Sequence, residues 1–253
     1  MLVLRSERAN RAVNIVLAAS ALLFLSPLLF LIGVVVRLTS VGPILYTQIR
    51  IGVDQRRSSD RRIHRERRGG GDRRAGLDRR ARVDRRALLN RRARMALAAR
   101  GRRWEDIGGN PFRIYKFRSM CIGAECGSGA VWATLNDARV TRVGRVLRKY
   151  RLDELPQLLN VLRGEMNIVG PRPERPSIFC RLRTEIPDYS LRQRARPGIT
   201  GWAQIKHRYD CCIDDVKQKV QFDLEYLHAK SLWQDITIMV KTIPVMLFRK
   251  GGW

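Results

Sequence analysis

Two adjacent carboxylates, Asp153 and Glu154, are the residues in this 253-residue chain whose types and spacing are best suited to chemistry. Arginines border the pair, with Arg148 before it and Arg172 after it. A carboxylate can act as a nucleophile, a second carboxylate can hold Mg²⁺, and arginine can grip two phosphate oxygens at once. This combination favours a phosphoryl-transfer site. The alternative for the pair taken alone is that it only caps a helix and is solvated.

The residues after the pair predict a helix that would position it. Leu155, Leu158 and Leu162 recur at helical spacing, and Pro156 is tolerated because it falls in a first turn. Asp153 is therefore expected at or beside the N-cap. Free amide donors and the positive end of the helix dipole would keep a carboxylate ionised there and would also suit a phosphate.

Further cations are expected on neighbouring elements. Residues 112–118 form a candidate strand that carries Lys116 and Arg118, which are both candidate phosphate contacts, although a lysine on a strand face is more often solvated. A second candidate strand covers residues 44–52. Residues 170–173 (GPRP) predict a stiff turn, because their prolines leave Arg172 little conformational freedom.

An arginine-rich insertion, residues 54–110, separates the two candidate strands. Residues 56–103 hold 20 Arg against five acidic residues and so carry more than half of the formal net charge of +27. Residues 72–95 repeat with a period of six, which would spread apolar residues around a helix and does not predict a coiled coil. Three interpretations remain open: a solvated disordered arm, a polybasic attachment to anionic headgroups, and an arm for nucleic acid or an acidic partner. Nucleic acid is disfavoured because no nucleic-acid-binding motif accompanies the charge.

The N-terminal part of the chain predicts a membrane element. Residues 13–36 are almost wholly apolar, and 24 residues of helix extend about 36 Å, enough to cross a hydrocarbon core of about 30 Å. Ser26 and Pro27 lie near the middle, where proline bends a helix, and arginines flank both ends, against the positive-inside tendency of a spanning helix. We therefore expect a re-entrant helix-break-helix over residues 1–39, with the catalytic domain over 40–253. The apolar tail, residues 232–248, predicts an interfacial helix.

The five cysteines and three histidines show no regular spacing for metal ligands. A zinc site is therefore not expected, and reduced thiols are the default.

Four ordered motifs resemble the bacterial sugar transferase family, the small monotopic polyprenyl-phosphate phosphoglycosyl transferases. They are residues 116–120 (KFRSM), 152–157 (LDELPQ), 170–173 (GPRP) and 197–204 (PGITGWAQ). The resemblance implies an α/β, α-rich, membrane-associated catalytic domain with a re-entrant N-terminal helix and interfacial amphipathic helices. It also implies a monotopic location on the cytoplasmic face of the bacterial inner membrane. Residues 164–167 (GEMN) depart from the family's usual GDMS, which puts a specific role for Glu165 in doubt.

The same resemblance implies a reaction. A sugar-1-phosphate would pass from a UDP-sugar to a polyprenyl phosphate, such as undecaprenyl phosphate, with release of UMP. Asp153 would be the nucleophile and would form a covalent phosphosugar intermediate, while Glu154 would hold Mg²⁺. Arg172, Arg148 and Lys116 would orient the phosphates. This reaction is the first membrane step of exopolysaccharide, O-antigen or glycoconjugate synthesis.

The expected partners are the UDP-sugar, the polyprenyl phosphate and the anionic lipids of the cytoplasmic leaflet, and a homodimer is allowed. The alternative function is that of a non-catalytic membrane protein whose arginine-rich arm recruits nucleic acid or an acidic partner. The intact set of Asp153, Glu154 and Arg172 argues against this alternative. The sequence identifies neither the sugar nor the pathway.

Overall fold

The computed structural model describes residues 2–54, 109–124, 137–207 and 212–248. All of them belong to one of the two units into which the chain divides, which comprises residues 1–54 and 108–253. The second unit, residues 55–107, lies outside the described residues. The predicted arginine-rich repeat is therefore not placed by the structure.

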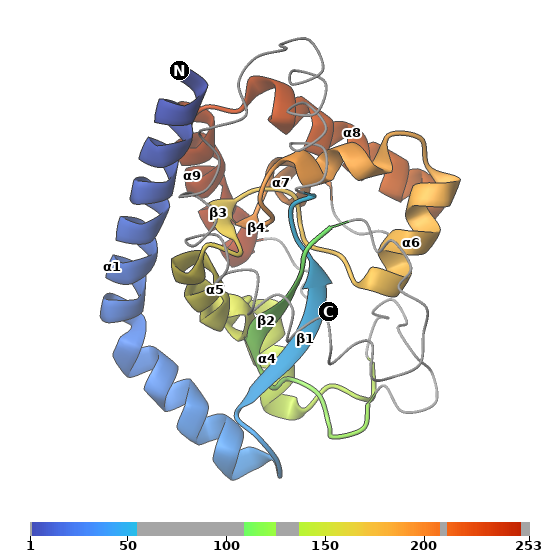
Figure 1. Cartoon of the computed structure of the whole chain (residues 1–253). Helices are drawn as coiled ribbons and strands as arrows, with labels where there is room; N and C mark the ends of the chain where they lie inside the picture. The colour runs from blue at the N-terminus through green and yellow to red at the C-terminus, as the bar shows by residue number, and fades with distance from the viewer. Residues whose placement is uncertain (1, 55–108, 125–136, 208–211, 249–253) are drawn as a thin grey trace, which may run out of the picture. The chain divides into compact units, whose positions relative to one another are not determined.

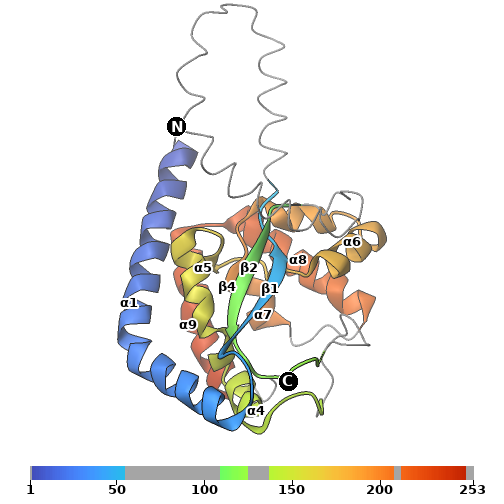
Figure 2. The same ribbon diagram turned by 60° about the horizontal axis from the view of Figure 1, so that its bottom comes forward.

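The first element is α1 (Leu2–Thr39), a helix that contains Pro27. Figures 1 and 2 both show α1 bent part-way along its length. Proline has no N–H with which to serve the carbonyl four residues before it, and here the Ser26 hydroxyl donates to that carbonyl, Leu23 O, at 2.7 Å. Ser26 and Pro27, where the sequence predicted a break, thus lie inside one continuous but bent helix. The re-entrant course stays a prediction.

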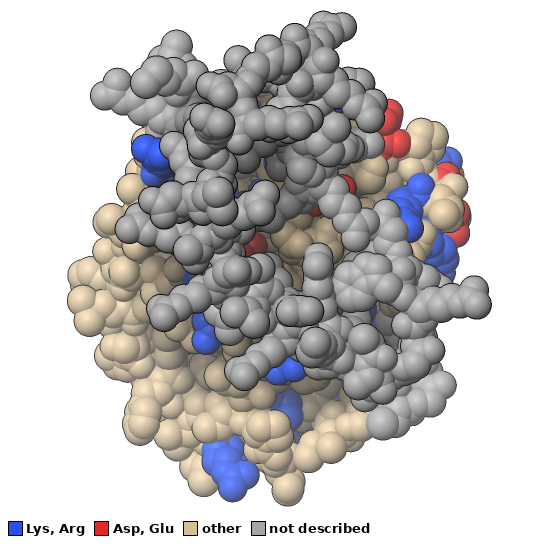
Figure 3. Space-filling view, viewed as in Figure 1, with Lys and Arg blue, Asp and Glu red and all other residues tan. Residues whose placement is uncertain are grey.

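By length and composition, α1 from Glu7 to Thr39 is able to cross a membrane. Its outward side chains are large and apolar, with Phe24 85%, Leu38 80% and Phe30 76% exposed. In Figure 3 the surface over α1, at the left of the view, is mostly uncharged. These features support membrane association.

The two predicted strands pair as an antiparallel hairpin of β1 (Leu45–Ile51) and β2 (Pro111–Phe117). Their register places Tyr46 opposite Lys116 and Arg50 opposite Phe112. The open end of the hairpin is fixed by backbone hydrogen bonds beyond the strands. They run from Gly52 N to Asn110 O (2.9 Å), from Asn110 N to Val53 O (3.2 Å) and from Asp54 N to Gln193 O (3.3 Å).

The rest of the described chain is a set of helices around a second, parallel pair of short strands, β3 (Asn167–Val169) and β4 (Gly198–Thr200). The helices are α4 (Arg142–Lys149), η1 (Leu152–Gln157), α5 (Leu158–Arg163), α6 (Pro176–Glu185), η2 (Tyr189–Arg194), α7 (Trp202–Lys206), α8 (Ile213–Ala229) and α9 (Leu232–Phe248). The α-rich α/β class is therefore confirmed. The predicted tail helix over residues 232–248 is present as α9.

The N-terminal helix packs onto the elements that carry the carboxylate pair. Ala18 of α1 is buried in one cluster with Ile114 of β2, Val161 of α5 and Met166. Arg11 also donates to Val161 O at 2.6 Å and to Leu162 O at 2.9 Å, which satisfies carbonyls at the end of α5. Because of these contacts, α1 and the catalytic elements share one hydrophobic core.

Candidate active site

The carboxylate pair lies in η1, a short 3₁₀ helix, and not at the start of an α-helix. Arg151 occupies the N-cap with φ 54°, in the left-handed region, and no side chain caps this end. The prediction that Asp153 caps an α-helix is therefore wrong, since the α-helix begins only at Leu158. Leucine spacing does not separate the two geometries, because residues at i and i+3, such as Leu155 and Leu158, share a face in a 3₁₀ helix as they do in an α-helix.

Glu154 is 5% exposed and accepts hydrogen bonds from two of the predicted phosphate-binding cations. Lys116 Nζ lies 2.7 Å from Oε1, and Arg172 donates through Nη2 to Oε1 at 2.5 Å and through Nη1 to Oε2 at 3.2 Å. Burial by itself raises the pKa of Glu154, but the charges of Arg172 and Lys116 outweigh it and hold that pKa well below its usual value. Glu154 is therefore ionised, and its negative charge is compensated by Arg172 and Lys116.

Asp153 is equally buried, at 6% exposure, but its carboxylate has different surroundings. Among the described residues, no hydrogen bond or ion pair of the Asp153 side chain is found. Burial raises the pKa of Asp153, the charge of Lys116 opposes this, and the charge of Glu154 adds to it. Asp153 thus has acceptor capacity and basicity available for a ligand, whereas most of the capacity of Glu154 is in use.

Arg172 reaches Glu154 from the turn of residues 170–173, which the sequence predicted to be stiff. Gly170 allows close packing here, because a Cβ on it would lie 2.3 Å from the Arg196 carbonyl oxygen. The negative charge of Glu154 raises the pKa of Arg172, so its guanidinium stays charged. The structure therefore brings Lys116, Glu154 and Arg172 together, and the contacts of Lys116 and Arg172 with phosphate stay predictions.

Arg148 and Arg118 have contrasting surroundings. Arg148 extends from α4, its charge lowers the pKa of Asp153, and its Nη1 is buried without a hydrogen-bond partner among the residues that the structure describes. Its Nη2 has a weak contact of 3.8 Å with Met120 Sδ. Arg148 therefore has an unused donor close to the carboxylate pair, which suits the predicted phosphate contact.

Arg118 instead binds the connection between α1 and β1. It is 6% exposed and donates to Pro43 O at 2.5 Å, Ser40 O at 2.6 Å, Ser40 Oγ at 2.7 Å and Val36 O at 3.3 Å. These contacts favour a structural role over the predicted contact with phosphate.

Arg50 and Glu174 were not predicted as site residues. Arg50 Nη1 lies 4.0 Å from Glu174, whose charge raises the pKa of Arg172, and the charges of Arg172 and Glu154 in turn act on the pKa of Arg50. One signal was available in β1: residues 46, 48 and 50 alternate onto one face, and the register places Tyr46 directly opposite Lys116. The arginine at position 50 therefore shares a face with a predicted site lysine.

The carboxylates of Asp153 and Glu154 suit a Mg²⁺ ion whose other ligands are substrate phosphates and water. The described residues contain no group of three or more Asp, Glu, His or Cys side chains that could hold a metal on their own. Mg²⁺, however, commonly uses only one or two carboxylates, with substrate phosphates and water as the other ligands. A carboxylate offers about four lone-pair positions, and the contacts above use three of those on Glu154. Asp153, together with the remaining position on Glu154 Oε2, fits this requirement.

Comparisons with known proteins agree with the motifs. A family model described as bacterial sugar transferase matches residues 5–60 and 95–249. The residues between these ranges fall within the arginine-rich segment.

Named relatives extend over most of the chain. It is 36% identical over 243 residues to a UDP-N-acetylgalactosamine-undecaprenyl-phosphate N-acetylgalactosaminephosphotransferase of Aeromonas hydrophila, covering 96% of this chain and 44% of the relative. It is 35% identical over 236 residues to a UDP-glucose:undecaprenyl-phosphate glucose-1-phosphate transferase of Escherichia coli K12, covering 92% and 39%. A putative undecaprenyl-phosphate N-acetylgalactosaminyl 1-phosphate transferase of Bacillus subtilis is 56% identical over 103 residues, covering 39% and 57%. The chain thus spans less than half the length of the first two relatives.

Proposed function

Because the chain belongs to the bacterial sugar transferase family, we propose that it transfers a sugar-1-phosphate from a UDP-sugar to undecaprenyl phosphate and releases UMP. The named relatives support the general reaction, and they differ in the sugar that their names contain. The donor proposed here is therefore a UDP-sugar whose sugar is to be identified by experiment.

The observation that carries the proposal is the unequal environment of the two carboxylates. Glu154 is held by Lys116 and Arg172, whereas Asp153 has no such partner among the described residues and a raised pKa. A nucleophile needs a free oxygen lone pair, and a more basic carboxylate is the better nucleophile. Asp153 therefore suits attack, and Glu154 suits the task of holding cations next to it.

In the proposed first step, an Asp153 carboxylate oxygen attacks the phosphorus that bears the sugar. The bond from that phosphorus to the UMP oxygen breaks, and UMP leaves with the electron pair. In the second step, an oxygen of undecaprenyl phosphate attacks the same phosphorus and the bond to Asp153 breaks, which restores the carboxylate. Each step exchanges one P–O bond for another, so no oxidant or further reactant is required.

The cations next to the pair would lower the repulsion between the two anionic reactants and the carboxylates. Arg172 and Lys116 already face Glu154, and Nη1 of Arg148, which has no partner in the described part of the chain, would be available to a phosphate oxygen. Mg²⁺, held by Asp153 or Glu154 together with the diphosphate of the donor, would add further charge neutralisation when bound.

The membrane part of the proposal rests on α1. Its apolar exposed face and its bend at Pro27 suit a re-entrant helix whose two ends both lie on the cytoplasmic side of the bacterial inner membrane. This placement would bring a lipid-linked phosphate and a soluble UDP-sugar to one site. Labelling of residues near Met1 by an impermeant reagent from the outer face would contradict it.

The first test is UMP release from a panel of UDP-sugars, with undecaprenyl phosphate and Mg²⁺, by wild type and by Asp153→Asn. We expect release by wild type with at least one donor, lipid-dependent turnover, and no turnover by the variant. Incubation with the donor alone should add the mass of one sugar phosphate to wild type and none to Asp153→Asn. Turnover by a folded Asp153→Asn protein would refute the role of Asp153.

A further inference from the structure

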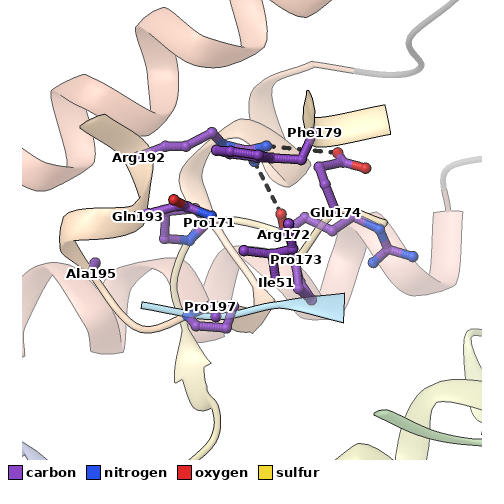
Figure 4. Close-up of a pocket in the computed structure, with 11 residues that line it drawn as sticks. Ile51, Pro171, Arg172, Pro173, Glu174, Phe179, Arg192, Gln193, Ala195 and Pro197 are labelled. Carbon is purple, nitrogen blue, oxygen red and sulfur yellow. Dashed lines mark hydrogen bonds and ion pairs between the residues drawn. The ribbon is translucent and has the colours of Figure 1, made fainter. Parts of the chain in front are cut away.

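The turn that presents Arg172 is fixed through four consecutive backbone carbonyls. Each accepts a hydrogen bond from a different donor: Pro171 O from Gly198 N at 2.9 Å, Arg172 O from Arg192 Nη2 at 3.1 Å, Pro173 O from Arg50 Nη1 at 3.1 Å, and Glu174 O from Ile51 N at 3.0 Å. Two of the four donors are arginine side chains. Figure 4 shows Arg192 reaching both the Arg172 carbonyl and the Glu174 carboxylate.

The Arg192 side chain is itself fixed by hydrogen bonds to other side chains. It is 3% exposed and donates through Nε to Asp223 Oδ2 at 2.9 Å, while its Nη1 donates to the Tyr189 hydroxyl at 3.0 Å. Asp223, on α8, is 2% exposed. One guanidinium therefore joins α8 and η2 to the backbone of the residue that faces Glu154.

Arg50 approaches the turn from β1. Its Nη2 donates to Gln48 Oε1 at 2.6 Å, and its Nη1 lies 4.0 Å from Glu174. Glu174 also contacts Arg192 at 3.7 Å and Lys219 at 2.9 Å. Arg192 and Arg50 therefore contact residues 172–174 in two ways. Each donates to a backbone carbonyl, and each lies near the Glu174 carboxylate.

We propose that Arg192 and Arg50 are positioning residues, which fix the 170–174 turn so that Arg172 meets Glu154 in two-pronged geometry. The inference rests on the proposed function, because it assigns these arginines a part in that reaction. They contact neither carboxylate of the catalytic pair; they act through the turn. A displacement of about 1 Å in a positioning element can cost on the order of 100-fold in rate.

The kinetic test is a double-mutant cycle between Arg192 and Arg172. Lysine keeps the charge of Arg192 but is a single point donor that cannot reach Asp223, Tyr189 and the Arg172 carbonyl together. We expect Arg192→Lys to lower kcat/KM by about 10- to 100-fold. In an Arg172→Lys background the same change should cost less than about threefold, because the residue it positions is already altered. Equal losses in the two backgrounds would overturn the proposal.

Arg11→Lys is the matched control, since Arg11 also donates to two backbone carbonyls but at the end of α5. Its effect on kcat/KM should be small and the same in both backgrounds. Where Arg192→Lys does not fold, Arg50→Lys enters the same cycle with the same expectation.

A second measurement separates this inference from the proposed reaction. Hydrogen exchange of the Gly198 and Ile51 amides, which donate to the turn, should accelerate by about tenfold in Arg192→Lys. Exchange of the Glu165 amide, which donates to Asn160 O, should not change. If wild type releases no UMP while the turn amides respond in this way, the reaction fails and the positioning of the turn stands. Unchanged exchange at both turn amides would refute the positioning role whatever the activity.

Discussion

Two glutamates whose side chains are largely shielded from solvent, twenty positions apart in the sequence, have the same kind of surroundings. The Glu154 centre consists of Glu154 with Lys116 at 2.7 Å, Arg172 at 2.5 Å and Arg151 at 3.9 Å. The Glu174 centre consists of Glu174 with Lys219 at 2.9 Å, Arg192 at 3.7 Å and Arg50 at 4.0 Å. Each has one lysine and two arginines around one carboxylate.

The centres differ in the second carboxylate beside each of them. Asp223, next to the Glu174 centre, forms an ion pair with Arg192 at 2.7 Å. Asp153, next to the Glu154 centre, has no hydrogen bond or ion pair from the described residues. Similar charges therefore produce a scaffold where every carboxylate is paired and a candidate reactive site where one is left open.

The strongest test of this difference is Asp153→Asn. We expect turnover to fall by about 10⁴-fold or more, since the nucleophile is lost. The free energy of unfolding should stay within about 1 kcal/mol, because no described residue forms a hydrogen bond or ion pair with this side chain that the substitution would remove. UMP release and denaturant unfolding in detergent measure the two effects, and a large loss of stability would show that Asp153 is a structural residue.

Glu174→Gln should give the opposite balance. Removal of the charge takes from Lys219 the carboxylate that lies 2.9 Å from its ammonium group in a site with little solvent, so we expect a loss of about 3 kcal/mol in the free energy of unfolding. Denaturant unfolding tests this, with the exposed Glu185→Gln as control, which should cost less than about 0.5 kcal/mol. A loss for Glu174→Gln as small as that of the control would contradict the structural importance of this centre.

The two centres should also respond to pH in different ranges. Asp153 must be ionised to attack, so the single-turnover rate should fall as pH decreases through its pKa, which burial raises above the ordinary 3.8. Lys116→Met should move this fall to higher pH, because the lysine charge lowers the pKa of Asp153. An unshifted or lower apparent pKa in the variant would disprove this coupling.

Glu174 has a pKa of about 2 in the fold, against an ordinary 4.5. A lowered pKa in the folded state contributes stability that is present above the unfolded pKa and is lost as pH falls toward the folded value. We therefore expect the Glu174 centre to lose its contribution between about pH 4.5 and 2. Unfolding curves of wild type and Glu174→Gln should converge across this range.

The smallest effect is expected for Arg151→Gly. The ion pair of Arg151 with Glu154 is long, at 3.9 Å, and glycine adopts φ 54° without the cost that a side chain imposes. The loss of charge and the relief of strain should leave the free energy of unfolding within about 1 kcal/mol. Turnover reduced more than about threefold would show that the third cation of the Glu154 centre takes part in the reaction.

Local patterns were sufficient to predict some features of this molecule. The strand pair and the tail helix follow from short sequence patterns. Lys116 and Arg172 were predicted as site residues from short motifs, and both lie next to Glu154. The 3₁₀ geometry of η1 does not follow from leucine spacing, because leucines three positions apart share a face in a 3₁₀ helix as well as in an α-helix. Arg118 was assigned to phosphate because of its neighbours in sequence, although its side chain reaches back to Ser40 and Pro43.

The Glu174 centre was not predictable in the same way. It joins residues 50, 174, 192, 219 and 223, which come from four separate parts of the chain, the last two lying on α8. No periodicity links these four parts to one another, and a buried arginine cannot be told from a solvated one by residue type. Only the tertiary structure reveals that these charges are paired.

The hydrogen bonds at the open end of the β1–β2 hairpin have a consequence for protein engineering. Asn110 is hydrogen-bonded to Gly52 and Val53, and the Asp54 amide donates to the Gln193 carbonyl, so the chain leaves β1 and returns to β2 at two anchored points. The cost of closing a loop between fixed ends grows only slowly with its length. Residues 56–103 are therefore a natural position for exchange, and a short linker, an affinity tag or a fluorescent domain inserted there should leave UMP release in detergent largely intact.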